Sequence, residues 1–68
     1  VSDEGAIKEL VDSVIAQNPQ SLDDYKNGKT RALGFLVGMA MKQSKGKGNP
    51  QIINKLLTER LEEYKANN

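Results

Sequence analysis

Side chains that could carry out catalysis are scarce in this sequence. Its 68 residues contain no His and no Cys, so the commonest general base, the thiolate nucleophile and the commonest metal ligands are absent. The acid pairs Asp23-Asp24 and Glu62-Glu63 would project about 100° apart on a helix, and neither forms an acid–base couple or a metal cup. We therefore expect no catalytic residue, no metal site and no cofactor in this chain.

A possible phosphate-binding segment is Gly28-Lys29-Thr30, which matches the end of the phosphate-loop motif. The first glycine of that motif would fall at Asp23, and no strand pattern precedes it, so we reject a nucleotide-binding loop. A weaker hypothesis is that amides at the start of the following helix hold a phosphate of a larger ligand, beside Lys29 and Arg31. The alternative is that both cations are simply solvated.

The charges are sorted along the chain, although they nearly cancel to a formal net charge of +1. Residues 1–24 contain one basic residue and six acids, whereas residues 25–58 contain seven basic residues and no acid. Because clustered Lys and Arg release counterions from phosphates, the acid-free stretch favours a polyanionic partner. A solvated basic face is the alternative.

Apolar residues recur at helical spacing, which predicts an all-α fold. A first helix is expected at about 3–17, ending before Pro19. Ser21 and Asp24 have the form of a capping box, which predicts a short helix at about 21–27 that Gly28 ends.

The second half of the chain predicts two more long helices. One is expected at about 30–44 and is ended by Gly46, and the other at about 50–65, where Asn49 caps the helix and Pro50 occupies its first position. We therefore expect a small helical bundle of three main helices and one short helix, forming a single domain over residues 1–68.

A small, basic edge runs along the third predicted helix. At about 100° per residue, five positions fall within one arc of roughly 80°, opposite the main apolar positions. These positions are Arg31, Gly34, Gly38, Lys42 and Lys45. Each glycine inside a helix costs about 1 kcal/mol relative to alanine. Either another helix crosses closely over Gly34 and Gly38, or a sugar-phosphate backbone approaches there. Phe35 borders this edge, where it would stack on a base or join the core.

An ordered series of short motifs runs in register from about Val14 to Leu61. The series comprises Asn18-Pro19, Asp24-Tyr25-Lys26-Asn27-Gly28-Lys29, Ala32-Leu33-Gly34-Phe35-Leu36-Val37-Gly38, Met41-Lys42, Lys45-Gly46-Lys47-Gly48-Asn49-Pro50 and Leu56-Leu57. It resembles the C-terminal tail domain shared by the GatB subunit of the aspartyl/glutamyl-tRNA(Asn/Gln) amidotransferase and the YqeY-like proteins, the GatB/YqeY family. The chain would be the C-terminal part of that domain.

The resemblance implies a tRNA-binding module that holds the body of the tRNA. Its binding role carries over onto basic positions of this sequence, and nearby glycines would permit close approach of the RNA. The basic positions are Lys29, Arg31, Lys42, Lys45 and Lys47, and the glycines are Gly34, Gly38, Gly46 and Gly48.

The resemblance also implies a larger enzyme around this piece. In that enzyme the GatB subunit uses ATP and Mg²⁺ to activate Glu-tRNA(Gln) or Asp-tRNA(Asn), with the A and C subunits of the amidotransferase as partners and glutamine as amido donor. None of that chemistry is expected in this chain, whose partner would be tRNA rather than DNA. Two alternatives stay open: a protein-docking module for the partner subunits, and a free-standing YqeY-like protein.

The sequence also bears on where in the cell the protein is found. No apolar run approaches the roughly 18 residues of a membrane span, and the chain, which begins at Val1, has the character of a soluble piece of a longer protein. We expect no membrane partner, and a cytoplasmic location in bacteria or an organellar one in eukaryotes.

Overall fold

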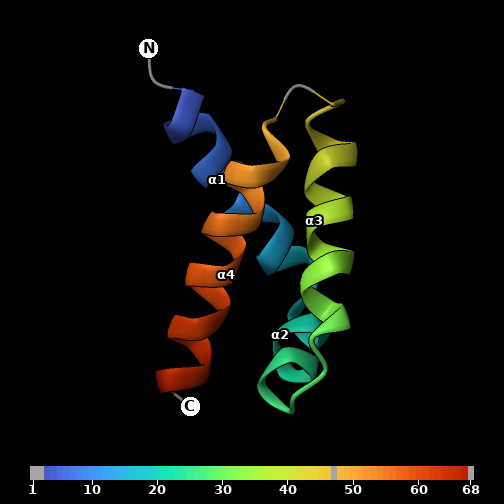
Figure 1. Ribbon diagram of the computed structural model, residues 1–68, viewed down its shortest axis with the longest axis vertical. Helices are drawn as coiled ribbons and strands as arrows, with labels where there is room; N and C mark the ends of the chain where they lie inside the picture. Colours follow the sequence, from blue (N-terminus) through green and yellow to red (C-terminus); the bar gives the residue numbers. More distant parts are fainter. Residues whose placement is uncertain (1–2, 47, 68) are drawn as a thin grey trace.

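The computed structural model describes residues 3–46 and 48–67, which form four α-helices (Figure 1). They are α1 (Asp3–Gln17), α2 (Pro19–Lys26), α3 (Arg31–Gln43) and α4 (Pro50–Asn67). Helices α1, α3 and α4 run alternately down, up and down the long axis, and α2 closes the lower end (Figure 1). Every pair of helices is in contact. The predicted all-α bundle is confirmed, and the described residues contain no strand.

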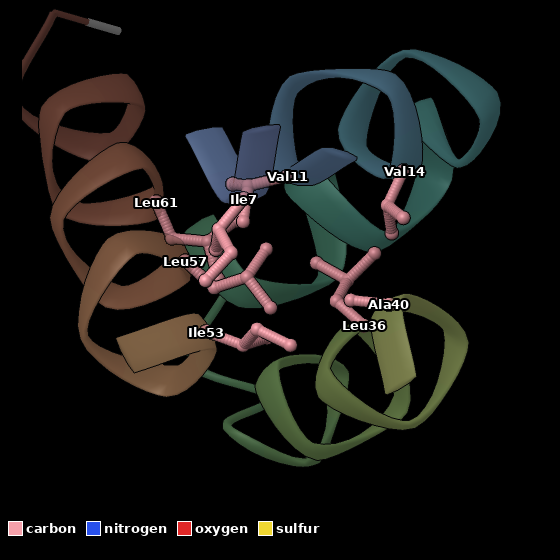
Figure 2. Close-up of a cluster of buried hydrophobic side chains, with 8 residues drawn as sticks. All are labelled: Ile7, Val11, Val14, Leu36, Ala40, Ile53, Leu57 and Leu61. Atoms are coloured by element: carbon pink, nitrogen blue, oxygen red, sulfur yellow. The ribbon is translucent and has the colours of Figure 1, made fainter. Parts of the chain in front are cut away.

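The core is built from one stripe of each long helix. Apolar side chains of α1, α3 and α4 point toward one another in the interior (Figure 2). The stripe residues are Ile7, Val11 and Val14 from α1, Leu36 and Ala40 from α3, and Ile53, Leu57 and Leu61 from α4. Burying each larger side chain contributes about 1.5–3 kcal/mol. Leu10 and Ile15 of α1 pack at the border of this core and are only partly buried.

The start of α2 differs from the prediction. The helix begins at Pro19, two residues before the expected capping box at Ser21, and Asn18 is its N-cap residue. Pro19 takes the first helical position because its missing N–H has no partner to lose there. The Asn18 side chain makes no cap bond to α2 and instead donates to the Val14 carbonyl at 2.9 Å, within α1. A single residue thus joins the two helices, and the capping-box prediction was wrong.

A residue in the left-handed conformation follows the end of α2, and another follows the end of α3. Gly28 (φ 95°) ends α2 as predicted, and the amides of Gly28 and Lys29 donate to the carbonyls of Tyr25 and Asp24, the Schellman pattern. The same pattern ends α3, where the amides of Lys45 and Gly46 donate to Lys42 and Met41.

At the end of α3, however, the left-handed position is reached first by Lys45 (φ 57°) and not by Gly46 (φ 77°). The prediction that Gly46 ends the helix is therefore corrected by one residue. A side chain at this position costs about 1–2 kcal/mol relative to glycine. The lysine is thereby held on a tight, hydrogen-bonded turn directly beyond the last turn of α3.

Polar contacts tie several acidic side chains to neighbouring helices. The Tyr25 hydroxyl of α2 donates to Glu62 of α4 at 3.3 Å, and the Tyr64 hydroxyl of α4 donates to Asp23 of α2 at 2.9 Å. This reciprocal pair fixes the register of α2 against α4. Elsewhere, Arg60 of α4 pairs with Asp12 of α1 at 3.0 Å.

The two tyrosines give the fold a predictable dependence on alkaline pH. Burial, followed by the charge of Glu62, raises the pKa of Tyr25 above its ordinary value of 10.0. The hydrogen bond to Asp23, followed by burial, raises the pKa of Tyr64. Since both pKa values are higher in the folded state, their contribution to stability is complete below about pH 10 and is lost as the pH rises through the folded values.

We therefore expect the wild-type chain to lose more stability as the pH rises from about 9 to about 11 than the variant Tyr25→Phe/Tyr64→Phe, as measured by urea unfolding at several pH values. All other titratable groups are common to both proteins, so the difference between the two losses reports the two tyrosines. Equal losses for the two proteins would show that the tyrosine–carboxylate contacts do not couple to folding.

Candidate nucleic-acid interface on helix α3

One side of α3 is left uncovered by the rest of the fold. Its opposite side buries Ala32, Leu36 and Ala40, whereas the outward positions are all exposed. We call these outward positions the open face of α3: Arg31, Gly34, Phe35, Gly38 and Lys42. The open face points away from the core because the helix has only one apolar stripe to bury.

The two glycines of the open face have no packing reason within the described fold. A Cβ atom added at Gly34 or at Gly38 would meet no atom within 4 Å. The hypothesis that another helix of this chain crosses closely over them is therefore wrong for the described residues. Each glycine still weakens the helix by about 1 kcal/mol relative to alanine, and packing among the described residues does not account for the pair.

Phe35 lies on the open face with half of its surface (52%) exposed. It is the only large hydrophobic residue of the described chain that is exposed to this extent. The sequence left two interpretations of Phe35, a core residue and a surface aromatic, and the structure supports the second.

Three basic residues around this face have no ion-pair partner among the described residues. Across the described ranges only two ion pairs form, and neither involves Arg31, Lys42 or Lys45. Lys29, just before the helix, approaches Asp24 at 4.0 Å with 70% of its side chain exposed. At 1.5 Å per residue, Arg31 and Lys42 stand about 16 Å apart along the axis. Lys47 lies outside the described residues.

The acidic side chains are distributed elsewhere. Helix α3 and its flanking loops contain no acid. The carboxylates of Asp12, Asp23 and Glu62 are instead engaged by Arg60, Tyr64 and Tyr25 on other helices. Cations without an ion-pair partner among the described residues therefore gather on α3, while Asp24 of α2 lies beside Lys29 and Arg31 at the start of that helix.

The backbone amides at the start of α3 are less available to bind a phosphate than the sequence predicted. The amides of Thr30, Ala32 and Leu33 donate to the carbonyls of Gly28, Lys29 and Thr30, so they are occupied within the turn. A phosphate at this end would therefore be held by the side chains of Lys29 and Arg31 rather than by those amides. These two residues and Gly34 line a shallow hollow there.

The two glycines of the loop before α4 have different surroundings. Gly46 is exposed, with no atom within 4 Å of an added Cβ. Gly48 is half-buried, and a Cβ there would stand 2.6 Å from Cδ1 of Ile53, a fully buried core residue. The Gly48 amide also donates to the Ser44 hydroxyl at 3.3 Å. Gly48 therefore has a role in packing the loop onto the core.

The structure also brings together residues that sequence reasoning had not joined. Ser21 and Asp24 of α2 lie beside Lys29, Arg31 and Phe35, and together with Ala32 they line a hollow of about 290 Å³. In the sequence the first two were interpreted as helix caps. Their meeting with Phe35 depends on how α2 folds back on α3 at Gly28, and no local pattern signals that angle.

Within residues 3–46 and 48–67 no group of three potential metal ligands gathers, and no helix there is long and apolar enough to cross a membrane. The described features together define a small helical module that leaves one cationic helix face open to a partner.

Comparison with known proteins identifies the kind of module. Residues 1–61 match the family model of the GatB domain. The chain is also 66% identical over 58 residues to the GatB subunit of an aspartyl/glutamyl-tRNA(Asn/Gln) amidotransferase from Clostridium botulinum, and 62% identical over the same length to that of Clostridium tetani. These matches cover 85% of this chain and 12% of each relative. The chain belongs to the GatB domain family, which confirms the resemblance seen in its motifs.

Alanine substitutions should separate the glycines of the open face from the packing glycine. We expect Gly34→Ala and Gly38→Ala each to raise the free energy of unfolding by about 0.5–1 kcal/mol, because a helix interior with open space favours alanine. Gly48→Ala should lower it by about 1–3 kcal/mol, since the core around Ile53 would be overpacked. Urea unfolding measures all three. Destabilisation by Gly34→Ala or Gly38→Ala would contradict an uncovered face.

Proposed function

We propose that this domain binds tRNA through the open face of α3 and is a tail module of an amidotransferase GatB subunit. The observation that carries the proposal is the set of three exposed cations without carboxylate partners, Arg31, Lys42 and Lys45, beside a glycine-bearing helix face. Membership of the GatB domain family supports it, because its relatives are subunits of an enzyme whose name specifies a tRNA substrate.

Binding of this kind depends on charge and shape more than on base sequence. Lys and Arg gain affinity by displacing counterions from phosphates, and such contacts position the partner without reading its bases. The absence of side chains at Gly34 and Gly38 lets a sugar-phosphate backbone approach the helix closely between Arg31 and Lys42. Lys29 and Lys47, which precede and follow α3 in the sequence, would add further phosphate contacts.

The module would contribute affinity while the chemistry takes place elsewhere. Activation of Glu-tRNA(Gln) or Asp-tRNA(Asn) with ATP and Mg²⁺ would belong to the rest of the GatB subunit, and amidation would involve the A and C subunits. A cytoplasmic location in bacteria, or an organellar one in eukaryotes, goes with this function.

Docking of a partner subunit on the same face is the second candidate. The open glycines favour it, because a helix of another protein could cross closely over them. The uncompensated cations favour RNA instead, since interface cores are depleted of charge. Association that survives nuclease treatment and is lost when Gly34 and Gly38 are made bulky would favour docking. A free-standing YqeY-like protein is the third candidate, and the two relatives compared above, which are GatB subunits, support the tail module instead.

The salt dependence of tRNA binding tests the proposal with a charge-matched control. Arg31→Ala/Lys42→Ala/Lys45→Ala should reduce the slope of log affinity against log salt by about 2–3, since each phosphate contact contributes about 0.7–0.9. The control Lys8→Ala/Lys55→Ala/Lys65→Ala removes the same charge from exposed positions of α1 and α4 and should keep the slope of the wild type. Equal effects of the two variants, or no binding by the wild type, would contradict the proposal.

A further inference from the structure

Phe35 occupies a position that burial does not explain. Half of its surface is exposed, whereas the next residue, Leu36, is fully buried in the apolar stripe of α3. One turn earlier on the same face stands Arg31, and side chains at this spacing are direct neighbours on a helix. The ring therefore lies at the surface, next to a guanidinium that no described carboxylate neutralises.

The ring also forms one wall of the hollow between α2 and α3. This hollow, of about 290 Å³, is lined by Ser21, Asp24, Lys29, Arg31, Ala32 and Phe35. Its volume lies just below the usual range for ligand sites, about 300–1,000 Å³. It therefore suits one flat ring rather than an extended ligand.

The surroundings of Phe35 favour a nucleobase over a protein side chain. A protein interface gathers several apolar residues around its anchors, but no second large hydrophobic residue of the described chain is exposed like Phe35. A nucleotide needs one aromatic face for its base and nearby cations for its phosphates. Phe35, with Lys29 and Arg31 at the rim of the hollow, offers that combination.

We propose that Phe35 stacks on a single unpaired base of the bound RNA, while Lys29 and Arg31 contact the phosphates on either side of that base. This inference rests on the proposed function. The Asp24 carboxylate repels phosphates from the hollow and can accept a hydrogen bond from an amino group of the base. Bases inside a duplex are already stacked on their neighbours, so only a looped-out or bulged base reaches the ring. The site therefore selects an unpaired nucleotide rather than duplex alone.

The absence of tryptophan from the chain allows a direct test. The variant Phe35→Trp places a single indole at the site, and stacking of a base on it quenches its fluorescence. The probes are unfractionated tRNA, a fully paired RNA duplex, and the same duplex with one unpaired adenosine. We expect quenching with tRNA and with the bulged duplex, and no quenching with the paired duplex.

Affinity measurements with a second variant complete the test. Phe35→Leu keeps an apolar side chain but removes the aromatic face, and it should weaken binding of tRNA and of the bulged duplex by about 5- to 150-fold, the equivalent of about 1–3 kcal/mol per stacked base. Binding of the paired duplex should weaken much less than binding of the bulged duplex, and Phe35→Trp, which keeps an aromatic face, should retain most of the tRNA affinity that Phe35→Leu loses. Thermal unfolding of each variant checks that the exposed substitution leaves the fold intact.

The outcomes separate this proposal from the one on which it rests. If the wild type binds tRNA with a steep salt dependence but Phe35→Leu binds equally well and Phe35→Trp is not quenched, the stacking proposal fails and the tRNA-binding function stands. If the wild type binds none of the three RNAs, both fail. If Phe35→Leu loses a protein partner and keeps its RNA affinity, the ring belongs to a docking surface and the stacking proposal is overturned.

Discussion

Burial of Leu36 and Ala40 against α1 and α4 fixes the rotation of α3 about its own axis. Both side chains are fully buried, and a helix that buries one stripe must turn the opposite side outward. That rotation exposes Arg31, Phe35 and Lys42 together. The open face of α3 is therefore a consequence of core packing, and any change that rotated α3 would separate its residues.

The glycines show that the open face weakens the fold. Two glycines within α3 destabilise a small domain by about 2 kcal/mol in total, against a typical stability of only about 5–15 kcal/mol for proteins. Gly28 and Gly48 each have a structural reason in the fold. Gly28 adopts a left-handed conformation in a turn, and Gly48 lies close to Ile53. An added Cβ at Gly34 or Gly38 would meet nothing in the described fold, so nothing there compensates for these two glycines.

Much of the fold could be predicted from the sequence because helical spacing is a local signal. The stripe of α1, the restart at Pro50 and the rotation of α3 all follow from counting residues. The start of α2 was missed because Pro19 was interpreted only as the end of α1, although Asn18-Pro19 repeats the Asn49-Pro50 pattern that begins α4.

The site was only partly predictable for a different reason. Spacing placed Arg31 and Lys42 on one edge, but whether another helix covered that edge depended on tertiary packing. The hollow that joins Asp24 to Phe35 depends on the angle between α2 and α3, and the packing role of Gly48 depends on its contact with a core residue of the next helix. Such relations between segments have no signature in a single local pattern.

If the open face of α3 is the surface of the bundle that meets RNA, the contact should be visible residue by residue. Titration of the isotope-labelled chain with tRNA, followed through backbone amide NMR shifts, makes this measurement. We expect the largest shifts to cluster at Arg31, Gly34, Phe35, Gly38 and Lys42 and to extend to Lys45. Shifts concentrated on the outer faces of α1 and α4, with α3 unaffected, would contradict the assignment of this face to RNA.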